Sequence, residues 1–349
     1  MRVKNLEILQ SIIYNVEQHP KDIVAFVAEK FSLSKPAVLH YVKELLKEGI
    51  LIAEGKTKGR RYGLAVLAEF SETLPLEPNL QEDIVWSKKI KPYLKDIKSN
   101  VVETCGYGFT EILNNAIDHS RGSMVSLSLK LTAAKITMVL HDNGIGIFKK
   151  IKESLGLEDE RHAILELSKG KLTTDPEKHS GEGIFFTSRM FDIFNIWSGE
   201  LFFAHLRSGN DWLTEARRPI EGTFVNLEIS TNSDREPSKV FELFTSSDGD
   251  YGFTKTRVAV DLARHGDENL VSRSQAKRLL ARLERFREVV LDFSDVQSIG
   301  QAFADEIFRV FRKGHPGIKL VYINALPEVE RTISWVDTIP QDDLFGNVI

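Results

Sequence analysis

The 349-residue chain has almost no cysteine and no long apolar segment. Its one cysteine, Cys105, has no second thiol for an internal disulfide and lacks the companions of a zinc site, so we interpret it as a small buried hydrophobic residue. No stretch approaches the ~18 apolar residues of a membrane-spanning helix, and the start MRVKNLEILQ has no signal-peptide core. These absences argue against a disulfide scaffold and predict a cytoplasmic protein with no membrane partner.

The chain also lacks a strong net charge. With 46 Lys and Arg against 50 Asp and Glu, the formal charge is −4, which gives no whole-chain argument for nucleic acid. The charge is unevenly placed, however. Residues 1–66 hold eleven Lys or Arg and seven Asp or Glu, a net +4, which leaves −8 for the remainder. Because the length allows two or three domains, this asymmetry points to a first domain with its own partner.

The first 66 residues alternate between helical patterns and a basic hairpin. Apolar residues at helical spacing predict helices over 4–16, 22–31 and 35–47, and two short strands flank the turn EGKTKGRR. This order resembles the bacterial winged helix-turn-helix, which implies DNA binding through the third helix and the wing. A solvated basic turn on a domain used for protein contact or dimerisation is the alternative, and a homodimer is left open.

The resemblance implies that DNA lies against one end and face of the third helix and against the basic turn. The residues expected there are Ser34, Lys35, His40, Tyr41 and Lys43 on the helix, and Lys56, Lys58, Arg60 and Arg61 in the wing.

Three polar and glycine-rich clusters follow in the middle of the chain. In FTEILNNAIDHS (109–120), Glu111 and Asn115 are four residues apart and share a helix face, where an acid and an amide can hold Mg²⁺ and a water. In HDNGIGI (141–147), Asp142 ends a strand and can accept a hydrogen bond from an amine. Taken singly, each pattern is also typical of a solvated helix face or an ordinary Asp-Asn-Gly turn.

The third cluster, HSGEGIFFTSRMFD (179–192), places Gly181 and Gly183 before a helix, so that free backbone N–H groups suit a phosphate. The preceding loop GKLTTDPEK (170–178) is long enough to be a lid. A fourth signal, Glu221-Gly222-Thr223, opens the strand FVNLEI.

In this order and spacing the clusters resemble the GHKL ATPases, a family that includes DNA gyrase, mismatch-repair ATPases, ninety-kilodalton heat-shock chaperones, histidine kinases and anti-sigma-factor kinases. The resemblance covers about 125 residues and implies ATP and Mg²⁺ as cofactors. It further implies that Asn115 holds Mg²⁺ and the phosphates, that Glu111 is the general base, and that Asp142 reads the adenine amino group with Thr223 assisting through water. Gly144 and Gly146 would shape the adenine side, and Gly181 and Gly183 would line the triphosphate.

Other polar residues near these clusters carry no predicted role. We interpret Asn114 as a polar neighbour without metal contact and the nearby histidines 119, 141 and 179 as structural or solvated. No histidine occurs between His40 and His119, which argues against autophosphorylation of the sensor-kinase type. Glu111 favours either hydrolysis or phosphoryl transfer to a hydroxyl, because both need a proton acceptor near the γ-phosphate.

The last third of the chain alternates strands and helices, which predicts a sheet covered by helices. The stretch EVVLDFSDVQSIGQAFADEIFRVF resembles the STAS fold of anti-sigma-factor antagonists, over roughly 255–340. The phosphoacceptor serine of those antagonists falls on Ala302 here, so we interpret this segment as an interaction module for a protein partner.

The sequence therefore predicts a multidomain chain of the α+β and α/β classes. The expected parts are a winged helix (1–66), a linker with little strand signal and an entry helix (67–98), a GHKL α/β sandwich (99–231) and a STAS-like domain (232–349). Our leading hypothesis is an ATP-binding and ATP-hydrolysing regulator that couples the nucleotide to DNA binding. The alternatives are a serine/threonine protein kinase acting on a STAS partner, and a hub that binds ATP without turnover.

Overall fold

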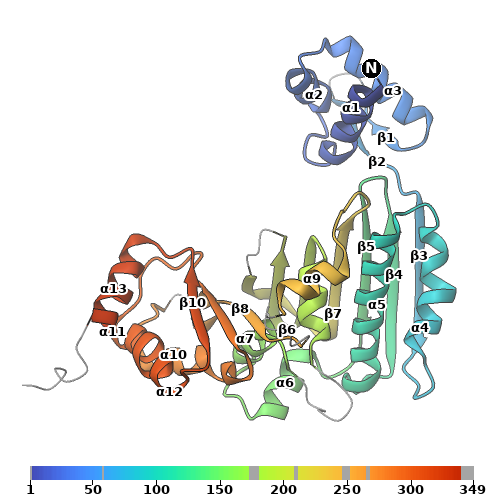
Figure 1. Cartoon of the computed structure of the whole chain (residues 1–349). Coiled ribbons are helices and arrows are strands. Elements are labelled where there is room, and N and C mark those ends of the chain that lie inside the picture. The colour runs from blue at the N-terminus through green and yellow to red at the C-terminus, as the bar shows by residue number, and fades with distance from the viewer. Residues whose placement is uncertain are drawn as a thin grey trace, which may run out of the picture.

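The computed structural model describes residues 2–56, 59–172, 181–207, 211–245, 252–264 and 268–338. It is a mixed α/β structure with three separate sheets, arranged as a small N-terminal unit, a central unit and a C-terminal unit (Figure 1). Within these residues, no helix combines the length and the hydropathy that crossing a membrane requires.

The N-terminal unit has the predicted order of three helices and a hairpin, while its winged-helix assignment stays a prediction. Its elements are α1 (Arg2–Asn15), α2 (Ile23–Phe31), α3 (Lys35–Lys47), β1 (Leu51–Glu54) and β2 (Arg61–Leu64). Helix α3 begins after Ser34, whose Oγ accepts from the Ala37 N–H at 3.4 Å. Its apolar face, with Val38, Val42 and Leu45 fully buried, packs into a core separate from that of the other two units.

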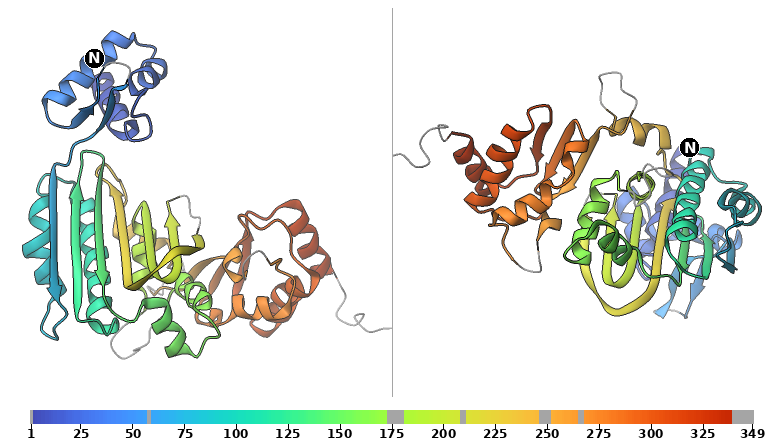
Figure 2. Two further views of the ribbon diagram at one scale, coloured as in Figure 1. Left: turned by 180° about the vertical axis from the view of Figure 1, so that it is seen from behind. Right: turned by 90° about the horizontal axis from the view of Figure 1, so that it is seen from below.

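A five-stranded antiparallel sheet forms the central unit, in the order β3–β4–β5–β7–β6. Its strands are β3 (Ala68–Pro75), β4 (Met124–Leu131), β5 (Lys135–Asp142), β6 (Ile193–Leu206) and β7 (Asp211–Ser230). Burial alternates along β4 and β5, because successive side chains point to opposite faces. One face is therefore packed, and Figure 2 (left) shows that the other carries no helix.

The predicted linker 67–98 was wrong in one respect, because it contains a strand. Residues 68–75 form β3, which pairs with β4 along its whole length and makes the edge of the sheet. An edge strand that is only half-buried on one side carries a weak apolar signal, and Pro75 at its end weakened it further. The rest of the segment is helical, as expected, in α4 (Glu82–Val85), η2 (Trp86–Ile90) and η3 (Lys91–Leu94).

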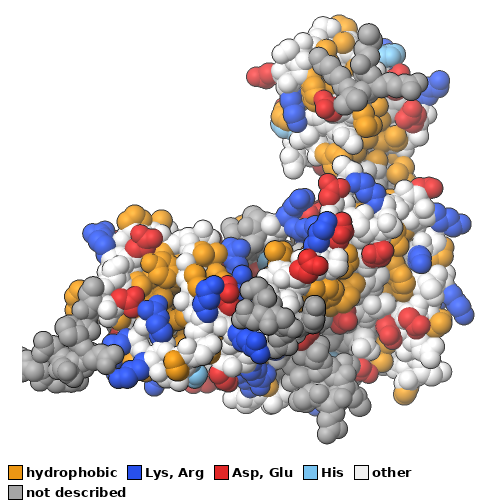
Figure 3. All heavy atoms as spheres, viewed as in Figure 1, with side chains coloured by type: hydrophobic (Ala, Val, Ile, Leu, Met, Phe, Trp, Pro, Cys, Tyr) orange, Lys and Arg blue, Asp and Glu red, His pale blue; other side chains and the backbone are white. Residues whose placement is uncertain are grey.

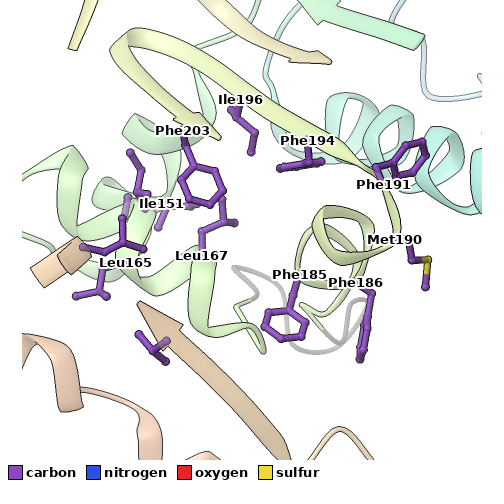
Figure 4. Packing of buried hydrophobic residues seen from close by; sticks show 14 of the residues in the cluster. Ile151, Leu165, Leu167, Phe185, Phe186, Met190, Phe191, Phe194, Ile196 and Phe203 are labelled. Carbon is purple, nitrogen blue, oxygen red and sulfur yellow. The ribbon is translucent and has the colours of Figure 1, made fainter. Parts of the chain in front are cut away.

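Helices cover the packed face of the sheet. They are α5 (Ser99–His119), α6 (Ile147–Leu155), α7 (Glu160–Lys169) and α8 (Gly183–Met190). Cys105 on α5 is fully buried, which confirms its interpretation as a core residue. Figure 4 shows Phe194 of β6 on the sheet side of α8, whereas Phe185 and Phe186 project from the other side of that helix, where both rings contact Phe244 and Phe253.

The C-terminal unit is a parallel sheet, in the order β10–β9–β8, covered by helices. It contains β8 (Lys255–Ala259), η4 (Val260–Ala263), α10 (Arg273–Leu280), η5 (Leu283–Arg285), β9 (Glu288–Asp292), α11 (Gln301–Ala304), η6 (Asp305–Phe311), α12 (Arg312–Gly314), β10 (Lys319–Ile323) and α13 (Pro327–Thr338). Helix α9 (Pro237–Leu243) leads into it from the central unit. The expected alternation of strands and helices is confirmed. Helix α10 ends at Leu280, two residues before Arg282, which adopts a left-handed conformation (φ 64°).

Candidate functional site

A cavity of about 310 Å³ lies between the packed face of the sheet and helices α5, α6 and α8. Its size falls in the range of small-molecule sites. Seven of the residues predicted from the separate sequence clusters line it, namely Glu111, Asn115, Asp142, Gly146, Gly181, Gly183 and Thr223. The fold therefore brings together segments more than 100 residues apart in the sequence.

One end of the cavity is polar and buried. Asp142 is 6% exposed, and its Oδ1 accepts the Gly144 N–H at 2.8 Å. Burial raises the pKa of Asp142 above its ordinary value, and backbone hydrogen bonds from Gly144 and Thr223 oppose the rise. The Thr223 Oγ1 accepts the Ile147 N–H at 3.0 Å, which ties the strand β7 to the start of α6.

Apolar side chains surround this polar end. They come from the sheet and from the helices, and include Leu140, Val225, Ile196, Ile147 and Ile112. An apolar slot that ends in a buried hydrogen-bond acceptor suits a flat heterocycle with an exocyclic amine.

Two glycines allow the backbone to pass closely around this end. A Cβ at Gly144 would lie 2.1 Å from the Ser120 carbonyl oxygen, so the turn after β5 touches the end of α5. Gly146 has φ 88° and a Cβ there would meet Ser198 Oγ at 2.5 Å. Gly144 contributes through its hydrogen bond to Asp142 rather than by lining the cavity.

The helix α5 presents the acid and the amide to the same cavity. Asn115 Nδ2 donates to the Glu111 carbonyl at 2.8 Å, so Oδ1 is the amide atom left to face a cation. Oxygen is the ligand atom that Mg²⁺ prefers, and the remaining positions of its octahedron would come from phosphate and water oxygens. The residues present therefore fit a magnesium ion bound together with a phosphorylated ligand.

Helix α8 begins against the Glu111 carboxylate. A Cβ at Gly183 would lie 1.8 Å from Glu111 Oε2, so only glycine allows this approach. Gly181 has φ 72°, and its carbonyl accepts the Leu172 N–H at 3.0 Å. Of the expected lid loop 170–178, residues 173–178 lie outside the described residues, as does His179.

Sequence reasoning missed one cation at this site. Lys150 on α6 lines the cavity, beside Asn114 and His119 of α5. Lys150 lies three residues after Ile147, a helix spacing that places both side chains on one face. The spacing of Lys150 from Ile147 was the sequence feature from which its place in the cavity could have been predicted. His141, in contrast, has the structural role expected of it, since its Nε2 lies 3.0 Å from the Glu221 carbonyl oxygen.

The predicted DNA-contacting residues divide into two groups. Lys35, His40 and Lys43 on α3 are exposed, and so are Lys56, Arg60 and Arg61 of the wing. The other two helix residues make contacts within the unit, because Ser34 caps α3 and the Tyr41 hydroxyl donates to Asn5 Oδ1 at 3.0 Å. Lys58 lies outside the described residues.

The end of α7 joins the cavity to the C-terminal unit. Leu167 and Leu172 line the cavity, while Lys169 between them is buried and its Nζ donates to Glu166 Oε1 at 2.6 Å. The same ammonium donates to the carbonyl oxygens of Arg278 and Ala281, at 3.1 and 2.9 Å. Burial lowers the pKa of Lys169, which its buried carboxylate partner opposes.

Comparison with protein families gives a match within the C-terminal unit. Residues 275–330 match the family model described as a STAS-like domain of unknown function (DUF4325). No curated protein matches the chain. The C-terminal unit therefore contains a STAS-like domain, as predicted from the stretch that begins at Glu288.

Proposed function

We propose that the chain binds Mg·ATP in the cavity of the central unit and hydrolyses it, and that the nucleotide state regulates what the outer units bind. One observation carries this proposal: the acid, the amide, the buried aspartate and the glycines of four separate sequence clusters line a single cavity. Chance similarity of a single motif does not predict such convergence. The resemblance to the GHKL ATPases supplies the roles.

In this proposal the buried end of the cavity selects adenine. Asp142 accepts a hydrogen bond from the exocyclic amine, Thr223 assists through a water, and the apolar walls enclose the ring. GTP carries a carbonyl oxygen in the place of that amine. Two acceptors would then face each other in a buried site, so we expect ATP to bind about tenfold or more tightly than GTP.

The other end of the cavity performs the chemistry. Asn115 holds the Mg²⁺, which neutralises charge on the phosphates, and the glycines at 181 and 183 let backbone N–H groups approach them. The carboxylate of Glu111 accepts a proton from the attacking water. A hub that binds ATP without turnover would have the same pocket with an inactive Glu111.

Protein kinase activity is the second candidate. The STAS-like domain favours it, because proteins with this fold are partners of anti-sigma-factor kinases in the resemblance described above. Within this chain, the acceptor position falls on Ala302, an exposed residue on the first turn of α11 that has no hydroxyl. The phosphoacceptor would therefore be a separate protein.

Coupling to the outer units follows different routes. The segment 167–172 touches both the cavity and the STAS-like domain, so a change in the cavity reaches that domain directly. The N-terminal unit lies at the far end of the sheet, where Lys135 Nζ pairs with Glu17 at 3.0 Å and with Glu228 at 3.2 Å. DNA binding by that unit is part of the proposal through its exposed basic residues.

Calorimetry with Mg·ATP tests the central claim. We expect the intact chain to bind ATP, GTP to bind at least about tenfold more weakly, and Glu111→Gln to retain binding while it loses phosphate release. Incubation with γ-labelled ATP and cell extract separates hydrolysis from protein phosphorylation, because only the kinase alternative yields a labelled protein. If the intact chain gives no heat at millimolar Mg·ATP, the proposal is wrong.

A further inference from the structure

A second cavity, of about 410 Å³, lies between the central and C-terminal units. Its walls come from the last turn of α8, the far ends of β6 and β7, the helix α9 with the residues before it, and the strands β8 and β9. Among the described residues, none lines both this cleft and the cavity described above. It is therefore a separate site, which we call the interdomain cleft.

Basic side chains from several elements converge on the interdomain cleft. They are Arg189, Arg207, Arg235, Lys239 and Arg257. Four carboxylates also line it, and each has a partner. Asp292 accepts from Arg257 Nε at 2.9 Å and Asp211 contacts His205, while Glu236 pairs with Lys239 at 2.8 Å and Asp234 with Lys98 at 3.0 Å.

Among the described residues, two of these arginines, Arg189 and Arg235, are not paired with a carboxylate. Arg189 donates to Ser188 Oγ and to the Ser168 carbonyl oxygen, and its guanidinium lies 3.9 Å from the centre of the Phe185 ring. Arg235 donates through Nη1 to the carbonyl oxygens of Phe191 and Arg189, at 2.6 and 3.1 Å. Among the described residues, neither guanidinium forms an ion pair with a carboxylate, and a guanidinium has five N–H donors to satisfy.

The electrostatics of the cleft are unfavourable when no anion is bound. Burial lowers the pKa of Arg189, and the nearby positive charge of Arg257 lowers it further, against the opposing charge of Asp211. Burial also lowers the pKa of Arg235. The negative charge of Asp192 opposes this change, and the positive charge of Arg207 adds to it. Partly buried arginines held near other positive charges are stabilised by a negatively charged ligand.

We propose that the interdomain cleft is a binding site for a phosphate group, either inorganic phosphate or a small phosphate monoester. Arginine N–H donors match phosphate oxygens in pairs, and donors that approach from α8, β6 and the segment before α9 surround a tetrahedral group better than a planar carboxylate. The ligand would connect residues of the central unit with Arg257 of the STAS-like unit, so its presence would favour the docked arrangement of the two units.

Titration calorimetry with inorganic phosphate, at constant ionic strength and without nucleotide or magnesium, tests the proposal on the intact chain. We expect binding, and about tenfold weaker binding in the double variant Arg207→Gln, Lys239→Gln. Both side chains are mostly exposed, at 64% and 66%, and each has one ion pair at the rim, so the fold is expected to tolerate the change. Arg312→Gln is the matched control, because it removes an exposed arginine with one carboxylate partner, Asp337, away from the cleft.

Titrations with other anions identify the ligand class, and comparison with the variant locates the site. Phosphoserine that binds more tightly than inorganic phosphate would identify a monoester as the ligand class, and the reverse order would identify free phosphate. Malonate that binds as tightly as phosphate would overturn the phosphate assignment. Absence of phosphate binding up to about 10 mM, or an equal affinity in the double variant, would overturn the site. The titration contains no nucleotide, so its outcome is read separately from that of the ATP-binding experiment.

Discussion

At the scale of single residues, Asp142 is the position where function and stability oppose each other. Its carboxylate is buried among apolar side chains at the end of β5, and this burial raises its pKa. A carboxyl group that is easier to protonate in the folded chain than in the unfolded chain destabilises the fold when it is ionised. Folding therefore does not account for the charge at this site, and the proposed recognition of an adenine amine would give it a function.

Replacement of Asp142 by Asn separates the two roles. We expect Asp142→Asn to weaken Mg·ATP binding by about tenfold or more, because a hydrogen bond to a charged acceptor is lost. At pH 7 we expect an equal or higher free energy of unfolding, since no buried charge remains. Because the folded-state pKa of Asp142 is raised, the wild-type chain gains stability as the pH falls through that pKa towards the unfolded value of 3.8.

Urea unfolding of both proteins across this pH range measures the difference. The stability advantage of the variant should be largest near neutral pH and should shrink as the solution becomes more acidic. An advantage that grows towards acid pH would contradict the pKa direction, and unchanged ATP binding would contradict the role of Asp142.

Lys150 is the second single residue for which the structure gives a testable role in ligand binding. It is the lysine that α6 places in the cavity, whereas its neighbour Lys149 is exposed and does not line it. We expect Lys150→Ala to weaken binding of ATP about tenfold by removing a charge-assisted contact with a phosphate. Adenosine, which has no phosphate, should bind both proteins equally. Lys149→Ala is the matched control, and an equal loss in both variants would show a non-specific effect of charge.

At the scale of elements, the last turn of α7 is the connection between the cavity and the STAS-like domain. Thr256 at the start of β8 donates its hydroxyl to the Lys169 carbonyl oxygen at 2.7 Å. Lys171 and Arg285 add a reciprocal pair, each donating to the other's carbonyl oxygen at 3.0 Å. Under the proposed function, this segment is the route by which a displacement at the cavity would reach the STAS-like domain.

Lys169 provides the test of this connection. Lys169→Met alone removes the ammonium partner of the buried Glu166 carboxylate and leaves it paired with the guanidinium of Arg282 at 3.9 Å, and we expect a loss of about 3 kcal/mol in the free energy of unfolding. The double variant Lys169→Met, Glu166→Leu should recover most of that loss, because both charges are gone. It still lacks the bonds to the carbonyl oxygens of Arg278 and Ala281.

Hydrogen exchange of α10 with and without Mg·ATP then measures the coupling. In the wild-type chain we expect the nucleotide to change the protection of α10, which ends at these carbonyl oxygens. The double variant should bind ATP with little or no change in α10. If the change in α10 persists in the double variant, the coupling does not pass through Lys169.

At the scale of the whole molecule, the two outer units attach to different parts of the central unit (Figures 1 and 2). The N-terminal unit contacts the opposite end of β5, where Ala134 packs in its core and Tyr14 Oη lies 3.3 Å from Thr231 Oγ1. The eight residues of β5 place that contact about 23 Å from Asp142. Acidic and basic side chains are interspersed over the face in Figure 3, so DNA binding would depend on the local basic residues of this unit.

DNA binding is therefore expected to be salt-sensitive and to depend on α3. Lys35→Ala with Lys43→Ala should weaken binding to duplex DNA and reduce its salt dependence by about two counterions. Fluorescence anisotropy, repeated with and without Mg·ATP, measures both effects. Lys88→Ala with Lys91→Ala, two lysines of the central unit, is the control. Equal affinity with and without ATP would rule out nucleotide control of DNA binding while it leaves ATP binding intact.

The sequence alone predicted the features that depend on residues close together in the chain. Helical spacing placed Glu111 and Asn115 on one face of α5, and the glycines before α8 predicted a close backbone approach, because both are local properties. The contiguous stretch that begins at Glu288, a strand ending in an aspartate and followed by a loop and a helix, carried the resemblance to the STAS fold. Pairing between distant segments is not encoded in such local patterns.

Tertiary structure decided the rest. Strand β3 is identified by its pairing with β4 and not by its own sequence pattern, because an edge strand buries fewer apolar side chains than a central strand. Lys150 and the five basic residues of the interdomain cleft come from elements whose own patterns are those of ordinary charged surfaces. Burial of Arg189 and Arg235 comes from contacts with residues distant in the chain, and desolvation of charge depends on neighbours that the local sequence does not specify.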